Sequence, residues 1–162
     1  MKKEGAINLL RRAGCSEKVI DHCIAVAELA GELARRHSAD YDLITTAALL
    51  HDIGRAKTHG VDHAVVGADI ARDFGLDEKI VRIIERHIGA GIPADEAQKL
   101  GLPKKDYVPE TLEEKIVAHA DNLVMGTKKV SIDKVIKNMQ NTLGKLHPAI
   151  QRMKKLHAEL YQ

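Results

Sequence analysis

The chain has 162 residues, 44% of them hydrophobic and 30% charged, which is the composition of one soluble globular domain rather than of a disordered or fibrous protein. Its 25 basic and 23 acidic side chains give a net charge of +2, so the overall charge carries no strong signal for nucleic acid or membrane as a partner. Three tyrosines, one phenylalanine and no tryptophan are too few aromatic residues for a base-stacking platform.

No segment approaches the apolar length that a membrane-spanning helix needs, and the first residues lack the apolar core of a secretion signal. The chain has two cysteines, Cys15 and Cys23, too few for a disulfide framework and typical of a reducing compartment. Neither belongs to a C-x-x-C pair, so both are expected to pack in the interior rather than bind metal. We therefore expect a cytoplasmic protein with no membrane partner.

The first predicted helix follows Ser16, a suitable N-cap. Apolar residues recur along it at intervals of three and four, the period of an amphipathic helix: Val19, Ile20, Cys23, Ile24, Ala27, Ala30 and Ala34. A shorter helix, Leu43–Leu50, is predicted with Asp42 as its cap. Its end, Ala47-Ala48-Leu49-Leu50, is apolar on nearly every side, which is typical of a helix in the core.

The rest of the chain is also predicted to be helical. A capping box at Thr111 marks one helix start, and Ser131 and Pro148 mark two more. The remaining predicted helices are Ala64–Asp73, Asp77–His87 and Leu112–Val124. No segment alternates with a period of two, and there is no internal repeat. The sequence therefore predicts an all-α fold, with residues 1–162 forming a single domain and the C-terminal helices, in 131–162, packed on it.

One stretch breaks the helical pattern. Ile88–Glu110 contains three glycines and three of the chain's four prolines. Within it, Pro93–Leu100 has room for one or two helical turns, ended by Gly101. A long irregular segment in a compact helical domain is often a lid or a binding loop. A plain solvated connector is the alternative, and both interpretations stay open.

Nine histidines are more than a chain of this length usually holds. The pair His51-Asp52 closes the most apolar predicted helix. An imidazole and a carboxylate at a buried helix end are costly to desolvate unless a partner satisfies them. A divalent metal ion would do so, because imidazole nitrogen and carboxylate oxygen are its usual ligands. The two oxygens of Asp52 could also bridge to a second ion.

The other candidates each have an ordinary structural alternative. His22 on an apolar helix face fits a hydrogen-bonded core histidine, and His63 fits an N-cap or first-turn residue after Asp62. His87 could offset the negative end of its helix, and Asp121 could bond to the backbone. The remaining histidines are expected to be structural or exposed: His37, His59, His119, His147 and His157.

Taken in order, these residues resemble the H…HD…D pattern of the HD-domain superfamily of metal-dependent phosphohydrolases, and the string His51-Asp52-Ile53-Gly54-Arg55 is most similar to its HDIG type. His22 opens the string H-C-I-A-V-A-E-L-A, and Asp121 lies in H-A-D-N-L. The string H-A-V-V-G-A-D, from His63, resembles a stretch of relatives that hold two metals. The resemblance covers about residues 19–128, and the whole chain is similar to small archaeal single-domain members.

The resemblance implies a helical HD-domain bundle in which metal ions activate water to hydrolyse a phosphate ester. It makes Asp52 the bridge between two metals and assigns His63 and His87 to the second. The ligands that it assigns to the first metal are His22, His51, Asp52 and Asp121. His51 and Asp52 are thereby the predicted catalytic pair. Several dinuclear relatives have two adjacent histidines where this chain has His87-Ile88.

Four residues are predicted to contact the substrate. Arg55, Lys57 and Lys128 are candidates for binding the phosphate, with a solvated surface charge as the alternative for each. Arg55 stands where lysine is common in relatives, so the charge is kept while the geometry changes. Tyr107, one of the few aromatic residues, is predicted to touch a base or a similar ring, with packing as the alternative.

The resemblance also implies the partners. The substrate would be a small, nucleotide-like phosphate ester, with a phosphodiesterase reaction favoured. A nucleotide phosphomonoesterase and a nucleotide-sensing domain without turnover are the alternatives, and a helical interaction module is the most remote. One or two divalent ions are implied, drawn from Fe, Mn, Ni, Zn and Mg. A homodimer is compatible with the sequence.

Overall fold

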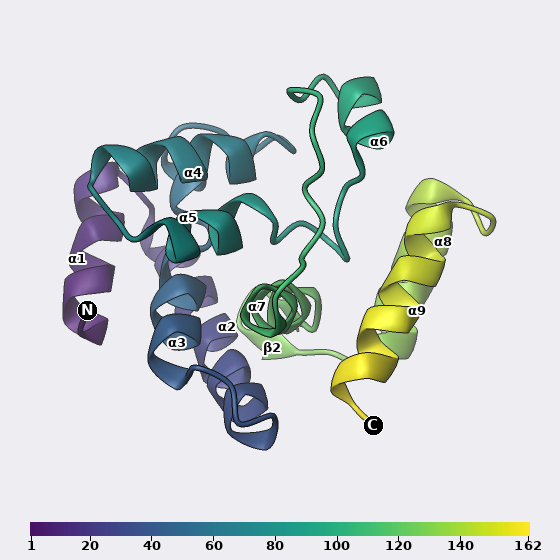
Figure 1. The fold of residues 1–162 in the computed structure, drawn as a ribbon, viewed down its shortest axis with the longest axis horizontal. Coiled ribbons are helices and arrows are strands. Elements are labelled where there is room, and N and C mark those ends of the chain that lie inside the picture. Colours follow the sequence, from purple (N-terminus) through teal and green to yellow (C-terminus); the bar gives the residue numbers. More distant parts are fainter.

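The apolar periodicity of the sequence becomes nine α-helices in the computed structural model, which describes residues 1–162 (Figure 1). The helices are α1 (Lys3–Ala13), α2 (Glu17–Arg36), α3 (Tyr41–Leu50), α4 (His63–Asp73), α5 (Glu78–Glu85), α6 (Ala94–Lys99), α7 (Leu112–Asn122), α8 (Ile132–Leu143) and α9 (Pro148–Leu160). A 3₁₀ helix, η1 (Ile53–Ala56), follows α3, and a short antiparallel hairpin of β1 (Val124–Met125) and β2 (Lys128–Lys129) follows α7. The all-α prediction is confirmed.

Side-chain caps set most of the helix starts. Ser16 and Thr111 each accept a hydrogen bond from a backbone N–H of the following turn, as predicted, a contact worth about 1 kcal/mol. The start of α3 differs from the prediction. Its cap is Asp40, whose side chain accepts from the backbone of Leu43, so Asp42 lies inside the first turn.

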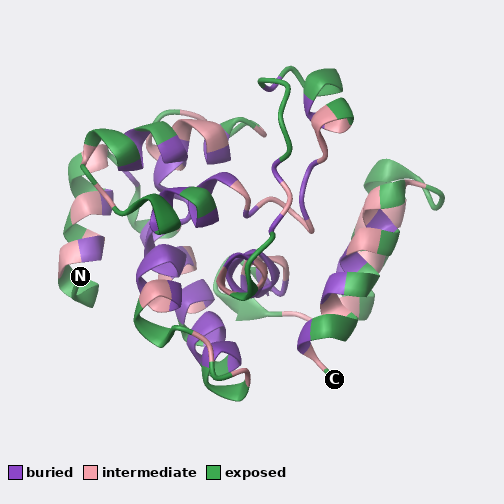
Figure 2. Cartoon of the chain, viewed as in Figure 1, coloured by how far each residue is buried: buried purple, intermediate pink, exposed green.

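The core forms where α2 packs along α3 and α7, and Figure 2 shows the buried residues gathered between these helices and α5. It contains 33 buried apolar residues. The predicted central helix is the most enclosed, since Ile44, Ala47, Ala48 and Leu50 are all 0% exposed. The C-terminal end of α3, where His51-Asp52 stands, is therefore deep in the protein.

Helix α1 and the β hairpin were not predicted. In α1 only Ala6 and Leu10 are buried, which is too sparse an apolar pattern to stand out in the sequence. The two strands have two residues each, too short to show the alternation that identifies a strand. Both elements owe their structure to what they pack against.

Ile88–Glu110, which we call the arm, rises away from the helices in Figure 1 and carries α6 near its tip. The arm contains the short helix that Pro93–Leu100 predicted, and Gly101 after it has a positive φ of 82°. Ile92 and Tyr107 exchange both backbone hydrogen bonds and so close the base of the arm. A small apolar cluster fills it: Ile92, Ala97, Leu102 and Tyr107.

α8 and α9 form a helical hairpin along one side of the bundle (Figure 1). It packs on the rest through Val135, Met153, Leu156 and Leu160, which belong to the main core. None of the helices combines the length and the apolar character needed to cross a membrane. That residues 1–162 form one domain stays a prediction.

Candidate metal centre

Six side chains converge where five of the helices end, begin or pass. They are His22 from α2, His51 after α3, Asp52 before η1, His63 at the first residue of α4, His87 just after α5, and Asp121 from the last turn of α7. These are the six predicted metal ligands, so the structure brings all of them together. That they bind metal stays a prediction.

Gly54 explains how two of these ligands come so close. A Cβ atom on Gly54 would overlap the carbonyl oxygen of His63 and come within 2.7 Å of the backbone nitrogen of Gly67. Only glycine allows η1 to approach the start of α4 in this way. The approach leaves Oδ1 of Asp52, before η1, 3.2 Å from Nε2 of His63.

One half of the centre lies around Asp121. Its Oδ1 is 2.9 Å from Nε2 of His22 and 3.2 Å from Nε2 of His51. Oδ2 of Asp52 faces the same two nitrogens, at 3.7 Å and 3.6 Å respectively. Two imidazole nitrogens and two carboxylate oxygens therefore surround one point.

The other half lies on the opposite side of Asp52. Its Oδ1 is 3.2 Å from Nε2 of His63 and 3.3 Å from Nε2 of His87, and these two nitrogens are 3.0 Å apart. Each carboxylate oxygen of Asp52 thus faces a different pair of histidines. This is the arrangement of a bridging ligand.

Backbone carbonyls orient all four imidazoles in the same sense. The Nδ1 atoms lie 2.6 Å from the oxygen of Gly126 for His22, 2.7 Å from that of Ala48 for His51, 2.8 Å from that of Gly60 for His63, and 2.6 Å from that of Ile84 for His87. A carbonyl oxygen only accepts, so each Nδ1 carries the proton. In the neutral ring Nε2 is then a lone pair that points into the centre, as in metal-binding histidines.

This donor set fits a cation. With Nδ1 protonated in both rings, the Nε2 lone pairs of His63 and His87 face each other and Oδ1 of Asp52, with no proton between them. The three residues are 7%, 1% and 6% exposed, so water does little to relieve the repulsion. A divalent ion, or an extra proton in its place, is needed to satisfy these acceptors.

The pKa values of the charged residues in the centre also indicate that it needs a positive charge. Burial acts to raise the pKa of Asp52, but the charge of His51 and the hydrogen bonds that His63 and His87 donate once they carry an extra proton outweigh it and hold that pKa far below its usual range. The pKa of Asp121 is likewise lowered against the effect of burial, chiefly by the charge of His51. Burial opposes a charge on His51, yet the two carboxylates raise its pKa well above the ordinary value. Without metal, a proton therefore supplies the positive charge.

Cys23 lies beside the centre, which the sequence analysis did not anticipate. It is fully buried, and its sulfur, an oxygen of Asp52 and a nitrogen of His51 lie within 4.8 Å of one another. The sole signal for this in the sequence is its position next to His22, and that neighbour points about 100° away around the helix. Cys23 therefore has the packing role that was expected, and the residues it packs against are the candidate ligands His51 and Asp52.

The structure separates the predicted phosphate-binding residues. Arg55 lies next to the centre, with Nε 3.8 Å from Oδ1 of Asp52 and Nη1 donating to the backbone oxygen of His59 at 2.8 Å. Lys57 is exposed and lines a depression with Ile70 and Phe74, at the end of α4 remote from His63. Lys57 is therefore not brought to the centre, because η1 ends before it and leaves it beside the C-terminal end of α4.

The other two residues predicted to contact the substrate, Lys128 and Tyr107, lie in different surroundings. Lys128 is exposed on β2, two residues beyond Gly126, whose carbonyl holds His22, so it lies near the rim of the centre. Tyr107 is 3% exposed, and its hydroxyl donates to the backbone oxygen of Pro103 at 2.9 Å. With its ring covered by the arm's cluster, Tyr107 has the packing role that was the alternative to a substrate contact.

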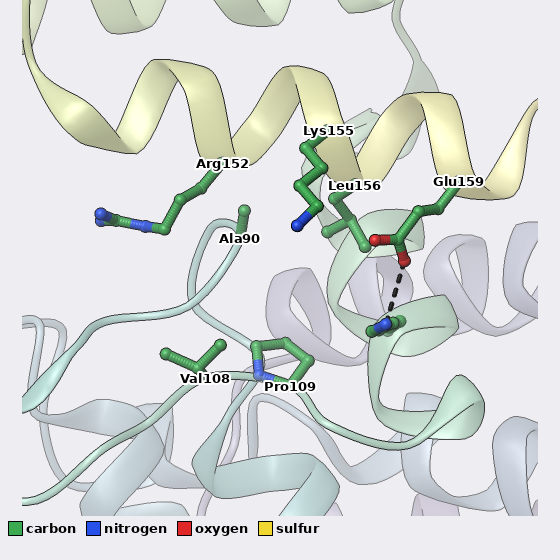
Figure 3. Close-up of a pocket in the computed structure, with 8 residues that line it drawn as sticks. Ala90, Val108, Pro109, Arg152, Lys155, Leu156 and Glu159 are labelled. Carbon is green, nitrogen blue, oxygen red and sulfur yellow. Dashed lines mark hydrogen bonds and ion pairs between the residues drawn. The ribbon is translucent and has the colours of Figure 1, made fainter.

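The arm is fixed at its root beside the metal centre. Nδ2 of Asn122, the neighbour of Asp121, donates to the backbone oxygen of Gly89 at 3.0 Å. Farther out, the arm and α9 enclose a pocket of about 240 Å³, and Figure 3 shows Arg152 and Lys155 of α9 facing it across from Val108. None of the six ligands lines this pocket. That the arm forms a wall of the metal centre stays a prediction.

Comparison with known proteins identifies relatives of the chain. Residues 19–126 match the model of the HD domain family. An uncharacterised protein of Methanocaldococcus jannaschii is 54% identical over 165 residues, covering 99% of this chain and 97% of that protein. The tRNA (cytidine(56)-2′-O)-methyltransferase of Thermoplasma volcanium is 50% identical over 155 residues, covering 96% of this chain. This chain spans 45% of the methyltransferase.

A solved structure has the same fold. The HD domain of the phosphodiesterase PgpH from L. monocytogenes aligns with a TM-score of 0.59 and 18% identity, covering 96% of this chain and 94% of that domain. A structure of the same domain in complex with cyclic-di-AMP also aligns with a TM-score of 0.59, at 15% identity. At these identities the likeness concerns the fold.

Proposed function

Because this chain belongs to the HD-domain family, we propose that it is a metal-dependent phosphohydrolase whose active centre is the cluster of four histidines and two aspartates. The observation that carries the proposal is the double contact of Asp52. One of its oxygens faces His22 and His51, and the other faces His63 and His87. A single carboxylate so placed is suited to hold two cations on either side of itself.

The two halves of the centre define which residues would hold each ion. His22, His51, Asp121 and one oxygen of Asp52 would hold the first, and His63, His87 and the other oxygen of Asp52 the second. A divalent ion bound there supplies a water of lowered pKa and neutralises charge on phosphoryl oxygens. Four imidazole nitrogens favour Fe, Mn, Ni or Zn over Mg, which prefers oxygen ligands.

The protein's own residues orient the substrate. The guanidinium of Arg55 uses Nη1 for the backbone of His59 and keeps other N–H groups for the oxygens of a phosphate. Its side chain is 28% exposed, so the substrate can reach it. Cys23 is 0% exposed and presents no thiol to a substrate, which favours attack by water over a covalent route.

We propose a ribonucleotide phosphodiester as the substrate class. The PgpH domain is named a phosphodiesterase and was solved with cyclic-di-AMP, and the relative from Thermoplasma volcanium is named for its action on tRNA. Both names concern ribonucleotides joined by phosphodiester bonds, which supports this choice over a monoester. A cytoplasmic location belongs to the proposal and is supported by the two unpaired cysteines, Cys15 and Cys23. A homodimer stays a prediction.

The test begins with chelator-treated protein reloaded separately with Mn²⁺, Fe²⁺, Ni²⁺, Zn²⁺ or Mg²⁺. Bound metal is measured by elemental mass spectrometry, and turnover is measured on bis-p-nitrophenyl phosphate, p-nitrophenyl phosphate, 2′,3′-cyclic nucleotides and cyclic dinucleotides. Asp52→Asn, which keeps the shape and removes the charge, is the inactive control. We expect the wild type alone to hydrolyse diesters after reloading.

The other outcomes separate the alternatives. Hydrolysis restricted to monoesters would identify a phosphomonoesterase. Binding of metal and nucleotide without any turnover would identify a sensing domain. Protein that binds no metal under any condition would contradict both, along with the proposed centre.

A further inference from the structure

The near-neutral net charge hides an uneven distribution along the chain. Residues 128–162 contain eight lysines and arginines and two acidic residues, a net charge of +6, whereas residues 1–127 contain seventeen and twenty-one, a net charge of −4. The basic segment is one continuous piece of structure, consisting of β2, α8 and α9 at one side of the bundle (Figure 1). The positive charge is therefore concentrated in one part of the structure.

Most of this charge has no partner in the protein. The two ion pairs of the segment join Arg152 to Glu96 at 2.6 Å and Glu159 to Lys115 at 3.0 Å, so each uses one charge of the hairpin. The seven lysines are exposed, and none has a carboxylate oxygen within 4.0 Å: Lys128, Lys129, Lys134, Lys137, Lys145, Lys154 and Lys155. They are available to an external anion.

Two of these lysines line the same groove. α8 and α9 enclose a groove of about 570 Å³, with Lys137 on the α8 side, Lys154 on the α9 side, and Ile132 and Ile136 among its lining. Asp133 is the one acidic residue that lines it. Two cations from different helices at one groove form a track suited to a row of phosphates rather than to a single carboxylate.

The basic surface begins at the metal centre. Gly126, in the turn of the β hairpin, accepts the hydrogen bond from Nδ1 of His22 at 2.6 Å. Lys128 and Lys129 follow in β2, and α8 starts directly after Ser131. A chain of phosphates lying on α8 would therefore have one end close to the proposed metal ligands.

The surface is suited to a nucleic-acid backbone rather than to unpaired bases. The one aromatic residue of the hairpin, Tyr161, is stacked on His157 with ring centroids 4.5 Å apart, so it offers no face for a base. A lipid surface would need an exposed apolar stripe. Val135 of α8 is buried in the core, and the well-exposed large apolar residues are Leu143 at the end of α8 and Leu146 in the turn that follows, at 47% and 96%, which do not form a stripe.

We propose that the α8–α9 hairpin is a docking surface for a folded RNA, which it holds by the phosphates of a stem, with Lys137 and Lys154 as its central contacts. The choice of RNA rests on the proposed function, in which the metal centre hydrolyses a ribonucleotide phosphodiester. The docking surface then serves to bring such a bond to the centre. The overall charge of +2 concealed this signal because the acidic remainder of the chain cancels the hairpin.

The test compares two double charge reversals. Lys137→Glu with Lys154→Glu alters the groove, and Lys3→Glu with Lys79→Glu makes the same change of charge at exposed residues of α1 and α5, on the opposite side of the bundle from the hairpin (Figure 1). Fluorescence anisotropy with a labelled RNA hairpin of mixed sequence is measured over a series of salt concentrations. We expect the groove variant to bind at least about tenfold more weakly and its salt slope to fall by about 2, while the control stays within about twofold.

The same preparations are assayed for turnover of bis-p-nitrophenyl phosphate and for helicity by circular dichroism. Unchanged turnover and helicity in the groove variant, with loss of RNA binding, support the docking surface. If both variants bound the RNA equally weakly, the effect would be one of net charge, and the proposed docking surface would be overturned. Wild-type protein that binds vesicles containing phosphatidylserine and not the RNA would also overturn it. RNA binding without turnover of any ester would contradict the proposed function and leave the surface standing.

Discussion

The side chain of Asp52 contacts both halves of the metal centre, and its position depends on the two residues that follow it. Gly54 permits η1 to pack directly on the start of α4, which places Oδ1 of Asp52 3.2 Å from His63. The other oxygen is left facing His22 and His51. Each half of the centre therefore depends on the same carboxylate.

Removing that carboxylate should empty the whole centre, whereas removing a histidine from one half should not. We expect Asp52→Ala to lose nearly all bound metal and activity, and His63→Ala to lose mainly the metal of its own half. At about 100 times the dissociation constant, metal stabilises the fold by about 2.7 kcal/mol, and this thermal stabilisation should vanish in Asp52→Ala. Elemental mass spectrometry and thermal melting measure both effects. The control is Asp69→Ala, on the exposed side of α4; full metal content in Asp52→Ala would refute the assignment.

Arg55 should act on the substrate and not on the metal. Its guanidinium lies 3.8 Å from Asp52 but donates to a backbone oxygen, so its removal leaves every ligand in place. We expect Arg55→Ala to lower kcat/KM by about 10–100-fold, the loss of a charge-assisted contact worth about 1.5–3 kcal/mol, with unchanged metal content. Lys57→Ala, two residues along but beside the far end of α4, should behave as wild type. Loss of metal in Arg55→Ala would make it a structural support of the centre instead.

At the scale of the elements, the arm is a small structure of its own. It has its own apolar cluster, and several contacts tie it to the bundle. Asn122 holds its root, Lys105 pairs with Glu85 of α5, and Glu96 pairs with Arg152 farther out. Its root adjoins Asp121 and His87, because Asn122 bonds to Gly89 there. We expect it to influence which ester is accepted.

Excision of the arm tests this expectation. Ile92 and Tyr107 form a hydrogen-bonded antiparallel pair, the geometry that a two-residue turn closes. Replacing 93–106 by Asn-Gly should therefore preserve metal content and the helicity of the bundle while the relative rates on different esters change. Glu96→Ala, which releases the outer tie alone, is the milder variant if the excised chain folds poorly. Unaltered proportions among the esters would show that the arm is only a connector.

At the scale of the whole molecule, α9 is joined to α7 by a pair of histidines, of which the one on α7 is buried. His119 is 0% exposed; its Nε2 lies 2.9 Å from Nδ1 of His157, and the amide of Asn122 donates to its Nδ1 at 3.3 Å. Burial, with a smaller contribution from the charge of His157, lowers the pKa of His119 to about 4. The folded protein thus keeps this ring neutral in mildly acidic solution.

This pair predicts how stability depends on pH. In the unfolded chain His119 has its ordinary pKa of 6.5, so below pH 6.5 the unfolded chain binds a proton on this ring and the folded chain does not. The free energy of unfolding therefore falls as the pH drops from 6.5 toward about 4. The full loss is about 3 kcal/mol. Denaturant unfolding in the presence of a chelator, at pH values across this range, measures it. His119→Gln should lose less stability over the same interval, and parallel pH profiles for the two proteins would contradict the assignment.

Helix positions could be predicted from the sequence because they depend on local patterns, and the candidate ligands could be predicted because their order along the chain resembles a known family. Apolar periodicity and the caps Ser16 and Thr111 involve residues within one or two turns of each other, and their energies do not need the rest of the fold. The order His22, His51-Asp52, Asp121 carried the family resemblance, which the match of residues 19–126 confirms. Helix α1 and the two-residue strands show no such local pattern and were not predicted, because these elements form by packing against the rest of the protein.

The tertiary structure decided which face each side chain occupies. Arg55 and Lys57 are two residues apart, yet η1 directs one to the centre and the other to the far end of α4. From the sequence Tyr107 was a candidate for a substrate contact, but in the structure its ring is buried in the apolar cluster of the arm. The orientation of the imidazoles and the gathering of unpaired lysines on one hairpin likewise depend on contacts between segments far apart in the chain. Such contacts are set by how helices pack, and packing energy is a property of the pair of surfaces and not of either sequence segment alone.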